Sequence, residues 1–484
     1  MREKIAMLEE EDKIEFSKLT WVCLIISFLC LMTFSGNLSY LFLMPLILCV
    51  GVTQKTQWKN ICEGVGVFGA YLFVFSIAIG QLGWIFKAEW CMVIALIVGV
   101  IFFKRQLNWG NRKLTLYFVF LGVVISLSTL FAHYNGTGNF KYLFQLNMTL
   151  FVPWMMVQFI YSKTGFRWVL FLLSLSTLIF IGSVWKEFVI RAIQNHFQHT
   201  HEPISYLLGI HLITLETATF STMAFIVFFL LLWRSEGRKA RIGWLFCVIV
   251  SLVVMVLSSE RITFVNGIIG VVLVLLFYFD LKKTLKFIGI IVVCCIVLFA
   301  IQGKVHTLSK YTSRVSTITS TDNSSNDGRF VMWEAGLHSI KEHPVYGVGY
   351  WNVYDVIRNY IVENPNNRII QKSPQIFQAE VTGRPWIHVH NTYLEMFVTT
   401  GVFGVLYFIL FLGIVPIYLY KLFRRDGKSL LLVGITLLFI SYYIAGLTDE
   451  IFMVWPLLKD SYLLLIFALM YVDRVGKREE KLDV

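Results

Sequence analysis

Long apolar segments alternate with short polar ones along most of this chain. Apolar runs recur from Leu19 to Tyr471, and most are separated only by short stretches rich in lysine and arginine. A helix that crosses a bilayer needs about 20 mostly apolar residues. The pattern therefore predicts an all-α, polytopic membrane protein with about 12–14 transmembrane helices. The candidate spans are residues 20–34, 38–53, 63–80, 86–103, 114–132, 146–160, 168–184, 218–233, 243–258, 262–279, 285–302, 391–420, 429–447 and 456–472.

Composition and charge support this interpretation. Hydrophobic residues make up 57% of the 484 positions and charged residues only 15%, which excludes an ordinary soluble enzyme. Nineteen lysines and arginines fall in the short loops predicted to be cytoplasmic, against five in the short outer loops. This bias follows the positive-inside rule and places both termini in the cytoplasm. It also accounts for the net charge of +12, so the expected partners are membrane lipids and not nucleic acid.

One long polar segment, residues 303–390, interrupts the pattern. It holds four of the nine prolines, charges of both signs and several aromatics, and no run long enough to cross a bilayer. We expect it to be an ordered extracytoplasmic catalytic loop with short helices. The predicted layout is a cytoplasmic N-terminal segment without a cleavable signal peptide, transmembrane helices, this loop, more transmembrane helices and a cytoplasmic tail. The boundaries are residues 1–19, 20–302, 303–390, 391–472 and 473–484.

Neither the cysteines nor the histidine-rich segment predicts a metal site. All eight cysteines lie in or beside apolar runs without a CxxC pair, so they are expected to be small core residues. A second outer segment carries four histidines, but their spacing lacks a helical i, i+4 ligand pair with a third ligand nearby. We therefore expect neither a metal nor a cofactor. The four histidines are His196, His199, His201 and His211.

Arg261 is the first candidate functional residue, because a charge at membrane depth is costly unless it has a task. It lies in SSERITFVNG, the short connection between two predicted spans, beside Glu260. Its guanidinium is therefore expected at the outer mouth of the helix bundle. The alternative is an arginine that only reaches the lipid headgroups.

The sequence DGRFVMWEAGLHSIKEHP predicts a helix in the outer loop. Asp327 is expected to cap it, and Arg329 and Trp333 share a face at i, i+4. Pro344 ends the helix, and the following YGVGYW contains two glycines that permit close backbone approach. The alternative is an amphipathic helix that rests on the membrane surface.

A pair of histidines stands where the outer loop re-enters the membrane, in WIHVHNTYLEM. A neutral imidazole can take a proton from a hydroxyl at physiological pH. Glu395 lies one turn beyond Asn391 and is expected to orient its amide or an imidazole. If the segment is helical, His388 lies about 200° around the axis from His390 and is the less important of the two.

Together these elements resemble the O-antigen ligase and O-antigen polymerase superfamily of bacterial membrane glycosyltransferases. The shared features are an arginine at the outer end of a mid-chain span, a long outer loop with GRxxxWxxG and a GxG turn, and a His-Asn pair that opens the next span. His390 and Asn391 are followed by nine residues and then by GVFG, which gives the ligase-type pattern H-N-x9-G-x-x-G. The resemblance covers residues 243–420.

The resemblance implies a GT-C-like fold and a glycan donor linked to undecaprenyl diphosphate. It implies that His390 is the catalytic residue and that Arg261 and Arg329 bind the diphosphate. No D-x-D or E-x-D pair occurs in the outer loops, so we expect arginines and not a metal to bind the diphosphate. The supporting residues are His388, Asn391, Glu395, Trp333 and Arg384.

The predicted function is an inverting O-antigen ligase in the bacterial inner membrane. It would transfer glycan from undecaprenyl diphosphate to a sugar hydroxyl of lipid A-core on the periplasmic face, without a metal. An O-antigen polymerase, which joins repeat units on the same donor, is the main alternative because the physics of the site does not separate the two. A lipid-linked glycan exporter and a purely structural membrane subunit are the remaining alternatives.

Overall fold

The structure is a computed structural model of the 484-residue chain. It describes residues 61–78, 88–107, 112–132, 143, 147–148, 150–198, 214–235, 237–258, 261–278, 282, 285, 289, 324–349, 352–372, 374, 388–427, 429–448 and 462–473. At some helical positions, including 182–198, 214–218 and 261–264, only the backbone is described.

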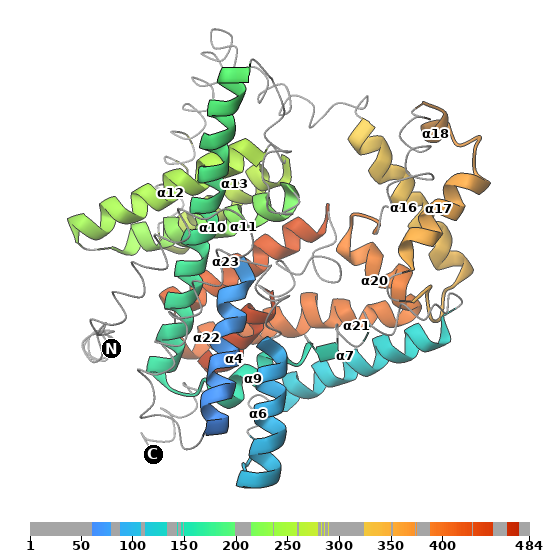
Figure 1. The fold of residues 1–484 in the computed structure, drawn as a ribbon. Helices are drawn as coiled ribbons and strands as arrows, with labels where there is room; N and C mark the ends of the chain where they lie inside the picture. The colour runs from blue at the N-terminus through green and yellow to red at the C-terminus, as the bar shows by residue number, and fades with distance from the viewer. Residues whose placement is uncertain are drawn as a thin grey trace.

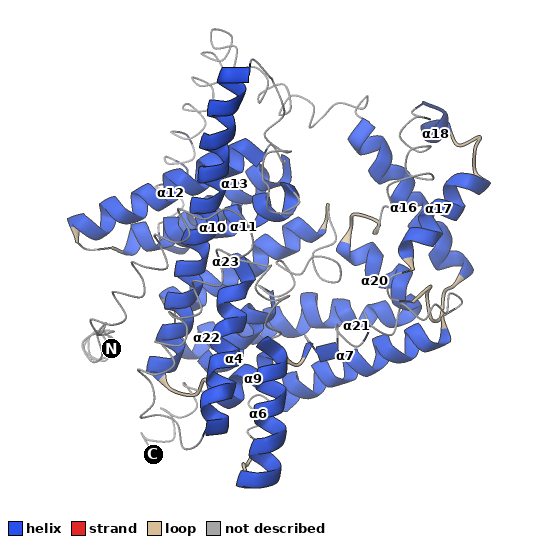
Figure 2. Ribbon diagram, in the orientation of Figure 1, coloured by secondary structure: helices blue, strands red, loops and turns tan. Residues whose placement is uncertain are grey.

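Every regular element that the described residues form is a helix, which confirms the all-α prediction (Figure 2). The helices are α4 (Ile61–Ala78), α6 (Ala88–Phe103), α7 (Arg112–Phe131), α9 (Val152–Phe159), α10 (Lys163–Gln198), α11 (Thr214–Arg234), α12 (Arg238–Ser258), α13 (Arg261–Tyr278), α16 (Ser324–Glu342), α17 (Val353–Glu363), α18 (Arg368–Lys372), α20 (Thr392–Thr400), η4 (Gly401–Phe403), α21 (Gly404–Phe408), η5 (Ile409–Ile414), α22 (Val415–Asp426) and α23 (Leu430–Gly446). Residues Tyr462–Asp473 form a further apolar helix.

The buried apolar side chains form two separate clusters. The larger one runs from α4 to the helix at Tyr462–Asp473, where α11 packs on α12 and α13, and α13 packs on α23. The smaller one joins α16, α17 and α18 to Val389 and Val398. In Figure 1 these three helices stand to one side of the main bundle, next to α20. The helices α16, α17 and α18 therefore have a core of their own, to which Val389 and Val398 on either side of the start of α20 also belong.

Helices of the main bundle expose apolar faces, and contact of such faces with water is unfavourable. On α7 the exposed large side chains are Leu116, Phe120, Val123, Leu127, Leu130 and Phe131, a spacing that keeps one face apolar along the whole helix. Arg112–Phe131 and the helical run Thr392–Asp426 are long and apolar enough to cross a membrane. Six shorter apolar helices accompany them: Cys62–Phe75, Ala88–Phe103, Thr219–Trp233, Val265–Tyr278, Leu430–Gly446 and Tyr462–Asp473.

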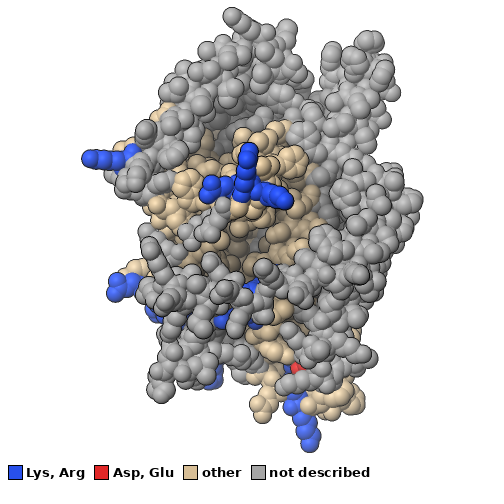
Figure 3. All heavy atoms as spheres, turned by 90° about the vertical axis from the view of Figure 1, so that its left-hand side faces the viewer, with Lys and Arg blue, Asp and Glu red and all other residues tan. Residues whose placement is uncertain are grey.

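Basic side chains gather on the face of the bundle that holds the start of α12 (Figure 3). Arg238, Lys239 and Arg241 are all exposed there. The charge pattern assigns this loop to the cytoplasm, and that assignment stays a prediction.

Two predicted spans differ in form from the structure. The span expected at 168–184 is part of α10, which continues to Gln198, because helical hydrogen bonding does not stop where hydropathy falls. The span expected at 391–420 is interrupted by the 3₁₀ turn η4 and the π-helical stretch η5. Pro416, which lacks an N–H, lies in the first turn of α22, and a π-type widening accommodates the missing hydrogen bond.

Candidate functional site

The His-Asn motif lies in the turn that leads into α20, and not within a helix. His390 has a φ of +52°, a left-handed conformation that is uncommon for a residue with a side chain. Such a conformation persists only where the surrounding structure requires it. The 200° separation expected for a helical segment therefore does not apply, because residues 388–390 precede the helix.

Glu395 holds this turn through the backbone. Its Oε2 atom accepts a hydrogen bond from the Val389 N–H at 2.8 Å, and the residue is only 2% exposed. The carboxylate sits in the first turn of α20, where the helix dipole favours a negative charge. This bond constrains the peptide just before His390. The predicted contact of Glu395 with an amide or an imidazole stays a prediction.

The two imidazoles lie against each other. Their ring centroids are 4.2 Å apart with an interplanar angle of 62°, and the His390 N–H donates to Nδ1 of His388 at 3.3 Å. Because that Nδ1 atom accepts, a neutral His388 carries its proton on Nε2. His388 is 4% exposed, whereas His390 is partly exposed. The geometry thus distinguishes the two residues, with His388 buried and His390 partly exposed.

Asn391 stabilises the start of α20 through both polar atoms of its side-chain amide. Its Oδ1 atom accepts from the Leu394 N–H at 3.0 Å, which makes it the helix N-cap. Its Nδ2 atom donates to the Leu447 carbonyl, also at 3.0 Å, at the C-terminal end of α23. Asn391 therefore ties the motif to the main bundle.

The GxG turn after α16 is hydrogen-bonded to the other end of α20. The N–H groups of Val348 and Gly349 donate to the carbonyls of Val398 and Thr399 at 2.9 and 3.0 Å. Gly347 and Gly401 both have positive φ, and a Cβ atom on Gly347 would lie 2.5 Å from the Val398 oxygen. Only glycine allows the two backbones to approach this closely.

Arg329 and Trp333 lie on α16, as predicted, but Asp327 does not cap the helix. Because α16 begins at Ser324, Asp327 lies in its first turn, where its carboxylate pairs with Lys372 of α18 at 3.4 Å. Arg329 is partly buried and has no ion pair or hydrogen bond within the described part of the chain. A guanidinium placed in this way is available to an anionic ligand.

The direction of α16 relates Arg329 to His390. A Cβ atom on Gly336 would lie 3.2 Å from Val389, and the chain after α16 meets the C-terminal end of α20, so the two helices run in the same direction. Arg329 is seven residues before Gly336, on the same face and about 10 Å along the axis. Arg329 is thus displaced from Val389 in the direction of the N-terminal end of α20. His390 lies at that end of the helix.

Arg261 is the first residue of α13, and its side chain is outside the described set. Asn266, five residues further on, donates to the hydroxyl of Ser441 at 2.7 Å. This bond joins the first two turns of α13 to the last two turns of α23, the helix whose C-terminal end Asn391 binds. Arg384 lies outside the described residues, as do three of the four clustered histidines and the side chain of His196.

The sequence missed several contacts that shape the site. Gly336, whose lack of a Cβ lets α16 approach Val389, belongs to the GRxxxWxxG pattern and could have been recognised as a packing position. The Asn266–Ser441 bond spans 175 residues and left no local signal. Among the described residues, no group of three histidine, cysteine or acidic side chains is arranged to hold a metal ion.

Comparison with known proteins adds independent information. An uncharacterised protein of Haemophilus influenzae is 26% identical over 234 residues, which cover 46% of this chain and 54% of that protein. The chain thus spans about half the length of the curated relative it matches. Residues 246–409 match the sequence profile of the family described as O-antigen ligase. That match includes α13, α16–α18 and the His-Asn turn, and it confirms that this chain is similar to the O-antigen ligase superfamily.

Proposed function

We propose that this protein is an O-antigen ligase that transfers glycan from undecaprenyl diphosphate to a sugar hydroxyl of lipid A-core. The observation that carries the proposal is the left-handed His390, which Glu395 and Asn391 constrain from both sides. A strained backbone conformation of this kind is typical of functional sites. The family match over residues 246–409 supports the same class of reaction.

His390 acts as the general base in this proposal. The acceptor hydroxyl gives its proton to an imidazole nitrogen as its oxygen forms a bond to the anomeric carbon. The bond between that carbon and the diphosphate oxygen breaks, and undecaprenyl diphosphate leaves with the electron pair. Attack opposite the leaving group inverts the anomeric centre. General-base assistance of this kind increases the rate by a factor of about 10²–10⁴.

Arginines stabilise the diphosphate. Arg329, which has no protein partner within the described residues, supplies one forked guanidinium, and Arg261 supplies another from the outer end of α13. Each charge-assisted hydrogen bond contributes about 1.5–3 kcal/mol. Arg384 is a further candidate contact, and Trp333 flanks Arg329 on α16. With arginines in this role, we expect transfer without a divalent cation.

The reaction takes place at the periplasmic face of the inner membrane. The exposed apolar stripe of α7 and the eight apolar helical segments support a polytopic, GT-C-like arrangement. Residues 303–390 then lie outside the cytoplasm. A single cysteine placed near residue 323 of a cysteine-free variant should react with an impermeant thiol reagent in spheroplasts. Protection of that cysteine until the cells are lysed contradicts this topology.

The decisive experiment uses purified protein, undecaprenyl diphosphate-linked glycan and either lipid A-core or no acceptor. A ligase produces glycan on lipid A-core, and activity should survive EDTA. A ladder of lengthened glycan without acceptor identifies a polymerase instead. If neither product forms and the protein moves lipid-linked glycan across a vesicle membrane, it is an exporter.

A further inference from the structure

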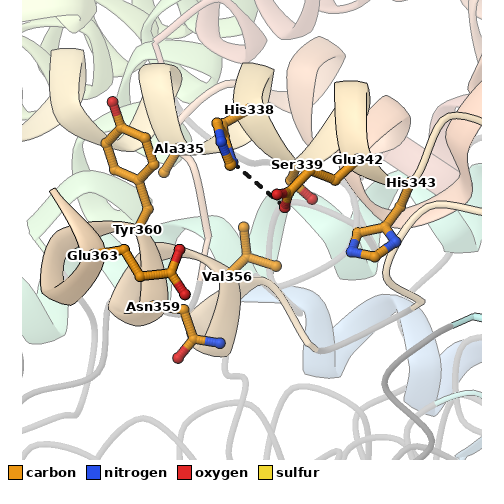
Figure 4. Close-up of a pocket in the computed structure, with 9 residues that line it drawn as sticks. All are labelled: Ala335, His338, Ser339, Glu342, His343, Val356, Asn359, Tyr360 and Glu363. Carbon is orange, nitrogen blue, oxygen red and sulfur yellow. Dashed lines mark ion pairs between the residues drawn. The ribbon is translucent and has the colours of Figure 1, made fainter.

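A polar pocket lies between α16 and α17. Its volume is about 90 Å³, and side chains of both helices face it (Figure 4). From α16 come His338, Ser339 and Glu342, and from α17 come Asn359 and Glu363. None of these residues has a part in the proposed chemistry.

Ser339 is the feature that points to a ligand. It is only 2% exposed, it lines the pocket, and its Oγ atom has no hydrogen-bond partner among the described residues. A serine inside a helix can bond to the carbonyl four residues earlier, which would remove the cost of burial. Here it does not, and buried hydroxyls without a partner are rare in folded proteins. A polar group of a bound molecule can supply the missing partner.

The chemistry of the walls favours a sugar. Two carboxylates, an amide and two imidazoles present both acceptors and donors, which suits hydroxyl groups that can do either. Ala335 and Val356 supply apolar surface at the same place, suited to the C–H groups of a sugar ring. The hydroxyl of Tyr360 donates to Glu334 at 3.3 Å, and burial, followed by the charge of Glu334, raises the pKa of that hydroxyl. Tyr360 therefore stays neutral and presents its ring to the pocket.

Other small ligands fit less well. Glu342 and Glu363 would repel a phosphate group. A metal ion requires several ligating side chains at short distances, and no such group of three occurs in the described part of the chain. His338 is already paired with Glu342, its Nδ1 atom lying 3.4 Å from Oε2.

The pocket is near enough to the His-Asn turn to hold part of the same substrate. Ala335 lines the pocket, while its neighbour Gly336 faces Val389 and Leu394. Consecutive residues lie about 100° apart around a helix, so the pocket and the contact with Val389 occupy neighbouring faces of α16. A glycan chain with one unit at His390 can pass around this helix to reach the pocket.

We infer that the pocket between α16 and α17 binds a neutral sugar unit of a glycan substrate, beyond the unit that reacts. The inference rests on the proposed function for its substrate class. The sugar belongs either to the donor glycan or to the acceptor, and the two sources share the same recognition chemistry.

The test measures binding of free oligosaccharides to the purified full-length protein in detergent, by calorimetry or saturation-transfer NMR. One probe is the oligosaccharide released from the lipid-linked donor by mild acid, and the other is the core oligosaccharide. Neither carries a lipid or a diphosphate, so the arginines contribute nothing. One probe should bind, and which one binds identifies the source.

Variants assign that binding to the pocket. Asn359→Ala and Glu363→Gln should each weaken it by about tenfold, since each removes or weakens polar contacts to the sugar. Ser339→Ala, which removes only the hydroxyl, should weaken it by a smaller factor. Arg358→Ala is the matched control, because Arg358 is exposed on α17 next to Asn359 and does not line the pocket. Thermal unfolding confirms that each variant is folded.

The outcomes separate this inference from the proposed function. If neither oligosaccharide binds although transfer proceeds, or if the pocket variants bind like wild type, the inference is wrong and the ligase proposal stands. A pocket that binds Zn²⁺ or Mn²⁺ through His338 and Glu342, and no sugar, also overturns it. Conversely, a His390→Asn protein that transfers glycan normally contradicts the proposed mechanism, while oligosaccharide binding would still support the pocket.

Discussion

Glu395 and Val389 are joined by a hydrogen bond of 2.8 Å from the backbone N–H of Val389 to the buried carboxylate. The bond closes the turn that contains His390, and its donor is the residue directly before His390. Since His390 adopts a left-handed φ of +52°, the carboxylate stabilises a backbone conformation that the side chain alone would disfavour. Glu395 is thus a positioning residue for the proposed base.

We expect Glu395→Ala to lower kcat by about tenfold or more, because a small misplacement of a catalytic group has a large effect on rate. KM for the donor should change little, since the diphosphate contacts are elsewhere. Glu395→Gln retains an oxygen that can accept the Val389 N–H and should recover part of kcat. Steady-state kinetics with lipid-linked glycan measures both parameters. Equal loss in the two variants would assign the effect to charge and not to the hydrogen bond.

His390→Asn should reduce turnover by about 10² or more, the usual range for loss of a general base. Asparagine tolerates the left-handed conformation better than alanine does, so this variant removes the imidazole with little strain. Donor affinity should stay close to wild type, because a neutral imidazole adds little to diphosphate binding. Rates and donor binding are measured on the same preparation.

His388→Ala should have a smaller effect than His390→Asn. His388 is buried, and its Nδ1 atom accepts the His390 N–H, so its loss loosens the turn without removing the base. The shape of the pH–rate profile should then be unchanged while kcat falls. A larger loss at His388 than at His390 would reverse the assignment of the base.

Arg329→Ala should weaken donor binding as well as turnover, because contacts to the diphosphate exist in both ground and transition states. Arg329→Lys should recover only part of the loss, since lysine keeps the positive charge but cannot make the bidentate hydrogen bonds of a guanidinium. Lys341→Ala on the same helix is the control, because that lysine is exposed near the end of α16. Donor titration by fluorescence or calorimetry distinguishes these cases. Unchanged donor affinity in Arg329→Ala removes this residue from the diphosphate site.

Gly347→Ala and Gly401→Ala should destabilise the protein. Each places a side chain at positive φ and brings a Cβ atom within 2.5 Å of a backbone oxygen, and the strained conformation alone costs about 1–3 kcal/mol. Gly243→Ala in α12 is the matched control, since a Cβ atom there meets nothing within 4 Å and alanine favours the helix. Thermal unfolding in detergent should show a lower midpoint for the first two variants and an equal or higher one for the third.

Much of the fold could be predicted from local pattern. Helices occur at most of the apolar runs that the structure describes, and α16 covers both Arg329 and Trp333 as the spacing indicated. Helix ends were harder to predict. Asp327 has the residue type of a cap, but α16 starts three residues earlier, and its carboxylate pairs with Lys372 of α18 instead.

The sequence by itself determined the all-helical class, the uneven distribution of charge, and the presence of His390, Asn391 and the GxG motif, because each is encoded within a few neighbouring residues. Only the tertiary structure decided how these parts meet. Val348 pairs with Val398 from 50 positions away, and Glu395 accepts a hydrogen bond from the Val389 backbone N–H, a partner that local spacing had not suggested. The left-handed turn that separates a buried His388 from a partly exposed His390 depends on α16, α20 and α23 together. No short window of sequence contains all three, so the choice between the two histidines became possible only once they were packed.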